Sequence, residues 1–175
     1  MSLIKTDAIQ TLAGKPIVNS TGSVLQVVST TKTDTFSTTS LLTDITGLSV
    51  AITPSASSSK ILVMVQCHIV GTDAGLILQL VRGSTAIYQG DANGDRRRAS
   101  MSGLYSPASS QNSYSGSGNH FHFLDAPSTT SATTYKVQGG IISGATAVIG
   151  ALIYDINNVN AARTPSTITV MEIAG

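Results

Sequence analysis

The sequence predicts an all-β protein, an antiparallel jelly-roll sandwich of about eight to ten strands. Apolar segments recur between turn signals along the chain, and no stretch shows a helical period of useful length. Charged residues make up only 11% of the chain, and Ser and Thr, which suit strands and turns, supply much of the polar surface. At 175 residues the chain can bury one good core. A β-sandwich of another topology is the alternative.

Residues 59–71 are the segment around which the other strands are expected to be arranged. The run is apolar and β-branched almost throughout. Such a run predicts a strand that is buried on both faces, in the middle of a sheet. Cys67 lies inside it and is the only cysteine, so an intrachain disulfide is excluded. We expect its thiol to act as a small buried hydrophobe and not as a nucleophile.

The other strands are predicted from apolar segments that lie between turns. Alternation of apolar and polar residues is clearest in 45–53 and 166–173, and each of these predicts one core-facing side. Turn signals at short intervals between residues 22 and 88 predict a meander. Besides 59–71, the predicted strands are 22–28, 45–53, 75–81, 85–88, 119–124, 133–142, 145–154 and 166–173.

Residues 137–154 carry no charge and contain a GxxxG pattern, so a membrane-spanning helix has to be considered. Glycines and polar residues dilute the apolar character, and Ser143-Gly144 is typical of a turn between two strands. The segment therefore predicts a β-hairpin, with no membrane insertion. The chain also begins without the charged and apolar pattern of a signal peptide, which favours synthesis in a cytoplasm.

The chain divides into an N-terminal arm, residues 1–21, and a jelly-roll domain, residues 22–175. The arm has scattered apolar residues ahead of the first regular strand. It is either a leader or strap of its own domain, or a docking arm that orders on a neighbouring subunit. Under the second hypothesis the docking residues are Ile4, Ile9, Leu12, Pro16 and Ile17.

Residues 90–118 are the longest irregular segment, and loops of this length are often functional. Arg96, Arg97 and Arg98 could bind an anionic group in a bidentate manner, or could form a solvated loop neutralised by nearby aspartates. Tyr105 and Tyr114 could stack on sugar rings, or could pack against a neighbouring subunit. These five residues are the candidate contacts to a receptor or partner.

His120 and His122 form the most suggestive local pair. Two positions apart on a strand, both imidazoles should project from one face, with Phe121 and Phe123 on the other. The pair is either an ordinary polar face or half of a metal site completed at the axis of a trimer. A cupin-type metalloenzyme would need further ligands, and no histidine follows His122. No metal or other cofactor is expected.

The sequence favours a protein that is not an enzyme. It has no nucleophile elbow and no phosphate-binding glycine loop, and its single glutamate, Glu172, lies in the last strand. Ten Lys and Arg residues against nine acidic residues leave a net charge of +1. A chain with so little net charge has no field to attract a polyanion, so we expect no nucleic-acid partner.

Several segments together resemble small virion structural proteins of tailed marine bacteriophages, which include tail-fibre-like and capsid decoration proteins. The resemblance is carried by residues 4–17, 20–27, 57–63, 134–138 and 166–173. It implies a jelly roll like that of C1q and tumour-necrosis-factor domains, assembled as a homotrimer on the virion surface after synthesis in the cytoplasm of a bacterial host. Its implied partners are other capsid or tail proteins, with a host surface glycan as a further partner for a fibre tip. A C1q-like glycan-binding module outside any virion is the alternative.

Overall fold

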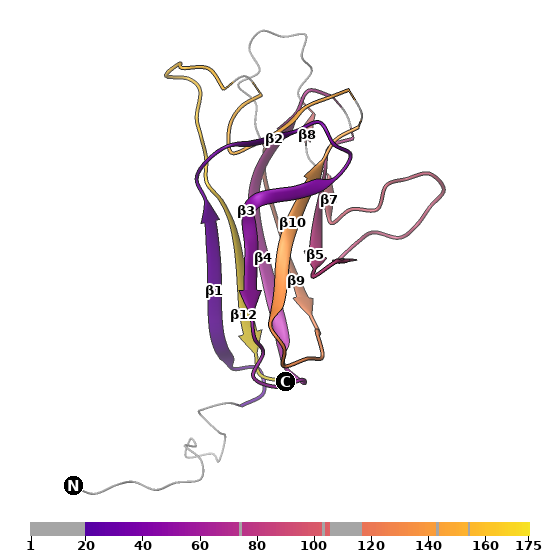
Figure 1. The fold of residues 1–175 in the computed structure, drawn as a ribbon, viewed down its shortest axis with the longest axis vertical. Coiled ribbons are helices and arrows are strands. Elements are labelled where there is room, and N and C mark those ends of the chain that lie inside the picture. Colours follow the sequence, from indigo (N-terminus) through magenta and orange to yellow (C-terminus); the bar gives the residue numbers. More distant parts are fainter. Residues whose placement is uncertain (1–19, 74, 103, 106–116, 143, 154) are drawn as a thin grey trace, which may run out of the picture.

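The computed structural model describes residues 20–73, 75–102, 104–105, 117–142, 144–153 and 155–175. Within these residues every regular element is a β-strand, so the predicted all-β class is confirmed (Figure 1). The strands are β1 Val24–Lys32, β2 Phe36–Thr38, β3 Thr43–Ile52, β4 Lys60–Gly71, β5 Ile77–Arg82, β6 Thr85–Ile87, β7 Met101–Ser102, β8 Leu104–Tyr105, β9 Ser117–Asp125, β10 Thr133–Gly140, β11 Ala147–Ile149 and β12 Ser166–Ile173.

The strands form two sheets that pack face to face as a sandwich. The seven-stranded sheet has the order β1-β12-β4-β11-β2, with β9 and β8 also paired to β4, and the five-stranded sheet has the order β3-β10-β5-β6, with β7 paired to β5. All pairings are antiparallel except that of β8 with β4. If the short β2, β7, β8 and β11 are set aside, the remaining strands, numbered in chain order, run 1-8-3-6 and 2-7-4-5. This is the strand order of a jelly roll.

The strand β4 is the centre of the seven-stranded sheet, as predicted. One of its edges pairs with β12 and β11, and the other pairs with β9 and β8. The prediction that it is buried on both faces is wrong for most of its length. From Ile61 to Ile69 every second residue is fully or almost fully buried, whereas the residues between them are half-buried or exposed. One face of β4 therefore packs on the core, and the other faces outward.

The predicted meander and the predicted hairpin at Ser143-Gly144 are both wrong. Successive strands mostly lie in opposite sheets, and β5 with β6 is a pair of neighbours in the chain that does form a hairpin. The two halves of the expected second hairpin separate in the same way, because β10 joins β3 and β5 whereas β11 joins β4 and β2. None of the described residues forms a helix long and apolar enough to cross a membrane.

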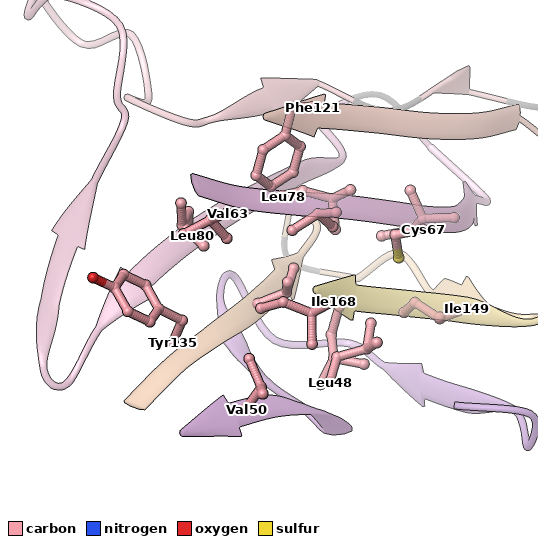
Figure 2. Close-up of a cluster of buried hydrophobic side chains, with 14 of the residues drawn as sticks. Leu48, Val50, Val63, Cys67, Leu78, Leu80, Phe121, Tyr135, Ile149 and Ile168 are labelled. Carbon is pink, nitrogen blue, oxygen red and sulfur yellow. The ribbon is translucent and has the colours of Figure 1, made fainter. Parts of the chain in front are cut away.

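The core lies between the two sheets. It is built from every second residue of each long strand, whose side chain points inward. Leu48 and Val50 of β3, Leu78 of β5, Val63 of β4 and Ile168 of β12 meet there (Figure 2). Cys67 is fully buried in the same cluster, and burial raises the pKa of its thiol to about 11. The prediction that Cys67 is a buried hydrophobe is therefore confirmed.

Candidate functional site

The outward side of the seven-stranded sheet presents an apolar row that crosses four strands. In the strand register, Val27 of β1 lies opposite Met171 of β12, Met171 lies opposite Leu62 of β4, and Leu62 lies opposite Leu124 of β9. Val27 and Leu124 are 53% and 54% exposed, and the two residues between them are half-buried. Directly opposed side chains on one face of a sheet touch, so the four form one continuous apolar strip.

Two further rows on this side are uncharged and mostly polar. The first contains Ser29, Thr169, Met64 and His122, and the second contains Thr31, Thr167, Gln66 and His120. The Ser29 and Thr169 hydroxyls are hydrogen-bonded at 2.8 Å. We call these three rows together the outer face; it comprises Val27, Ser29, Thr31, Leu62, Met64, Gln66, His120, His122, Leu124, Thr167, Thr169 and Met171.

The outer face is hollowed near its middle. An open hollow of about 530 Å³ is lined by Leu62 and Met64 of β4, His120 and His122 of β9 and Thr169 of β12, among others. None of its lining residues carries a formal charge when the histidines are neutral. The nearest charged residue on β4 is Lys60, which is exposed at the end of the strand opposite Ile173. The hollow therefore suits an apolar or neutral polar group, not an ion.

The outward side of the other sheet has a different character. Asp44 of β3 forms an ion pair with Lys136 of β10 at 2.7 Å and accepts a further hydrogen bond from Gln138. Farther along that sheet, Gln79 and Val81 are buried although they lie on the side of β5 away from the core cluster. The segment after β6 contacts this region, because Gln89 donates to the Gln79 side chain. The outward side of the five-stranded sheet therefore differs from the outer face in two respects. It carries an ion pair, and the segment after β6 contacts it.

The predicted placement of the histidine pair is confirmed. His120 and His122 are both exposed on the outer face, whereas Phe121 is buried and Phe123 packs against the core. Tyr88, at a positive φ of 52°, stacks on Phe123 with ring centroids 5.0 Å apart. Among the described residues, no group of three or more His, Cys, Asp or Glu side chains could hold a metal ion. The shared metal site at a trimer axis stays a hypothesis.

His68 is the third histidine of the chain, and it lies on the same side of β4 as Gln66. Its Nδ1 is buried and has no hydrogen-bond partner within the described residues. Burial lowers the pKa of His68 below the usual histidine value, which favours the neutral imidazole. All three histidines therefore lie on one side of the seven-stranded sheet.

The side chains of the three arginines at residues 96–98 donate hydrogen bonds within their own loop and to neighbouring segments. Arg97 donates to the carbonyl oxygens of Gly75, at 2.9 Å, and Leu41. Arg98 donates to the Gly90 carbonyl at 2.7 Å, and Arg96 donates to Asn93. No ion pair joins these arginines to Asp91 or Asp95, which also belong to the described part of the chain. Their binding to an anion remains a prediction, and their present contacts fix the loop against its neighbours.

The other predicted contact residues lie outside the part of the chain whose side chains the structure describes. Only the backbone of Tyr105 is described, in β8, where it pairs with Gly71. Tyr114 lies outside the described residues, and so do the docking-arm residues Ile4, Ile9, Leu12, Pro16 and Ile17. The boundary between arm and domain also stays a prediction.

Glu172 forms a buried polar centre that sequence reasoning missed. Its carboxylate is fully buried and accepts hydrogen bonds from Gln26 Nε2, Ser55 N, Ser55 Oγ and Ser59 Oγ at 2.6–2.7 Å. Burial alone would raise its pKa, but the hydrogen bonds from Ser55, Gln26 and Ser59 outweigh that effect and lower the pKa to about 2. The carboxylate therefore ties β1 and the loop before β4 to the last strand.

A second buried centre connects the two sheets. Asp125 of β9 accepts hydrogen bonds from Arg82 of β5 at 2.9 and 3.0 Å and from the Tyr135 hydroxyl of β10 at 2.6 Å. Burial, followed by the hydrogen bond to Asp125, raises the pKa of Tyr135 well above its usual value. With Tyr135 fully buried, this cluster has the character of a structural tie and not of an acid–base site.

No protein family model matches the chain, and no curated protein matches it. Among solved structures, the chain is similar to that of the infectious bursal disease virus Gt strain, with 17% identity and a TM-score of 0.41. It is equally similar to a VP2 subviral particle of that virus, and slightly less so to T=1 particles of a mutant VP2, with 16% identity and a TM-score of 0.39. The matches cover 97% of this chain but 41–43% of those chains, so it spans less than half of their length.

Proposed function

We propose that the protein is a non-enzymatic structural protein of a bacteriophage virion. It acts on the particle surface as a homotrimer, either as a tail or fibre component or as a capsid decoration protein attached through its N-terminal arm. The resemblance of residues 4–17, 20–27 and 166–173 to such proteins supports this proposal, and the jelly-roll strand order agrees with what the resemblance implies.

The observation that carries the proposal is the outer face. Contiguous apolar surface that is uncharged and uncovered marks a site of protein–protein contact in soluble proteins. Here the apolar strip between Val27 and Leu124 has the two uncharged rows on one side and Ile173 with the exposed Lys60 on the other. Val27 and Leu124 are more than half exposed, whereas Gln89 contacts the outward side of the other sheet. Such a surface suits a subunit of a larger assembly.

The test is to locate the protein by immunogold labelling of purified virions of the phage that encodes it. Label spread over the capsid supports the decoration role, and label confined to the tail supports the fibre role. Virions that carry no label would overturn the proposal. The glycan-binding alternative would then be examined by measuring whether the purified protein binds host surface glycans in a saturable way.

A further inference from the structure

The segment between β6 and β7 extends away from the sandwich and carries an exposed turn (Figure 1). Residues 91–98 are all exposed, and the turn is closed by a hydrogen bond from Arg96 N to the Asn93 carbonyl oxygen at 3.3 Å. Gly94 has a positive φ of 56°, a conformation that glycine adopts without steric cost. The side chain of Asn93 and the peptide unit that follows it are therefore both open to water.

Asn93 is followed by glycine, which holds for no other asparagine of the sequence. A glycine has no side chain to shield its amide nitrogen, so that nitrogen can approach the side-chain carbonyl carbon of the preceding asparagine. Both groups belong to one chain, and the attack closes a five-membered ring without a loss of translational freedom. Within the described residues the Gly94 amide nitrogen donates no hydrogen bond, so no existing contact has to break first.

Arg96 contacts the amide group of Asn93 that such an attack would reach. Its Nη1 donates to Asn93 Oδ1 at 3.0 Å and to the Asn93 carbonyl oxygen at 3.3 Å. When a nucleophile adds to the side-chain amide, Oδ1 becomes an oxyanion, and a guanidinium N–H that already points at it stabilises the new charge. The turn thus holds together a nucleophile, an accessible amide and a cation that stabilises the intermediate.

We propose that Asn93 is a self-modification site, at which the chain converts its own asparagine into aspartate and isoaspartate. The Gly94 nitrogen bonds to Asn93 Cγ, and the Cγ–Nδ2 bond breaks. The amide proton passes through solvent to the departing nitrogen, which leaves as ammonia. Water then opens the resulting succinimide at either of its two carbonyl carbons and leaves a carboxylate in place of the amide. Water is the only co-reactant.

The conversion changes the charge of a candidate contact surface. Residues 91–98 carry three arginines and two aspartates, and the new carboxylate cancels their excess positive charge. It forms beside Arg96, where it can accept the hydrogen bond that Oδ1 accepts in the unmodified chain. Anion binding by this arginine should therefore weaken as the protein ages. The chemistry does not depend on the proposed virion role, although a virion protein that is not renewed after assembly would accumulate the product.

The first test follows the purified protein during incubation at mildly alkaline pH, where hydroxide removes the amide proton. Peptide mapping by mass spectrometry should show that a carboxylate replaces the Asn93 amide. The internal control is Asn160, which is also exposed but is followed by alanine. The rate at Asn93 should exceed the rate at Asn160 at least about tenfold. An Asn93 that converts no faster than Asn160 would overturn the proposal.

Matched variants test the roles of the two neighbouring residues. Gly94→Ala should slow the conversion at least about tenfold, because a Cβ shields the nitrogen. Arg96→Met should slow it about threefold or more, whereas Arg98→Met loses the same charge but donates to the Gly90 carbonyl and should not. In concentrated urea Arg96→Met and wild type should convert equally fast, because the folded turn is lost. If folded Arg96→Met converts as fast as Arg98→Met, Arg96 does not stabilise the oxyanion.

Ion-exchange chromatography gives a second readout on the intact chain. The conversion lowers the formal net charge from +1 to zero, so modified protein should leave a cation exchanger earlier. Asn93→Asp marks the elution position of the aspartate product. Asn93→Gln would have to close a larger ring and should form almost no acidic species. Acidic species that appear in Asn93→Gln at the wild-type rate would place the modification elsewhere and overturn the proposal.

Discussion

At the scale of single residues, Glu172 should set the acid limit of stability. Its pKa is lowered from an ordinary value of 4.5 to about 2 in the folded chain. The stability that this carboxylate contributes is therefore fully present above about pH 4.5 and is lost as the pH falls toward 2. Chemical denaturation of wild type should show this loss between pH 5 and 2.5.

The matched variants for this prediction are Glu172→Gln and the exposed Asp91→Asn. Glu172→Gln should lower the free energy of unfolding at pH 7 by about 2 kcal/mol, since it weakens the buried hydrogen bonds from Ser55, Ser59 and Gln26. It should also flatten the acid dependence, and Asp91→Asn should do neither. An unchanged acid dependence in Glu172→Gln would contradict this role.

The second prediction at this scale concerns the contribution of the Tyr135 hydroxyl to stability. Tyr135→Phe removes the buried donor to Asp125 and leaves Arg82 as the remaining described donor to that carboxylate side chain. The free energy of unfolding should fall by about 1–2 kcal/mol. Tyr88→Phe is the control, because the ring of Tyr88 makes its stacking contacts. Equal effects of the two changes in urea denaturation would argue against the tie between the sheets.

Side-chain direction could be predicted from the sequence where it follows the period of a strand. The exposed His120 and His122 and the inward Phe121 needed only the alternation along β9. The partners of Glu172 could not be predicted, because Gln26 lies 146 positions away and only the sheet pairing brings it near. Local pattern determines which face a residue occupies, and tertiary pairing determines what it meets there.

At the scale of elements, Gly140 marks where β10 ends and the chain leaves its sheet. A Cβ at this position would overlap the backbone of Leu41 and Leu42, which has no freedom to move as a side chain would. Gly140→Ala should therefore lower the free energy of unfolding by about 3 kcal/mol, as overpacking against backbone does. Thermal or urea unfolding measures the change.

The control for this prediction is Gly90→Ala, since a Cβ there would meet nothing within 4 Å. It should change the free energy of unfolding by no more than about 0.5 kcal/mol. If both variants unfold alike, the close approach at Gly140 is not a constraint on the fold. The hairpin between residues 133–142 and 145–154 was predicted wrongly for a related reason. Strand signals in the sequence do not show which sheet each strand joins, and here β10 and β11 join different sheets.

At the scale of the whole molecule, the fold class followed from composition and alternation, whereas the jelly-roll strand order depended on long-range pairing. The buried face of β4 was predicted, and its outward face was not, because Leu62 and Met64 are as apolar as core residues. An apolar residue on the outside of a sheet has the same sequence signal as one in the core. The outer face was for that reason missed as a candidate site.

Deletion of residues 1–19 tests whether the N-terminal arm is needed for attachment to the particle and not for folding of the domain. The core cluster is drawn from residues between Val28 and Val170, and the first described strand is anchored by the hydrogen bond of Gly22 N to the Ala174 carbonyl. If the arm is the docking segment, the deletion should abolish binding to particles that lack the protein and leave the unfolding temperature within a few degrees. Binding that survives the deletion would exclude the arm as the attachment device.

The most direct test of the proposed function is cryo-electron microscopy of purified virions of the phage that encodes the protein. We predict trimers of the jelly roll on the particle surface, at capsid or tail positions, with the outer face in contact with another subunit. Virions without this protein, or a bound monomer whose Val27 and Leu124 face solvent, would contradict the proposed function.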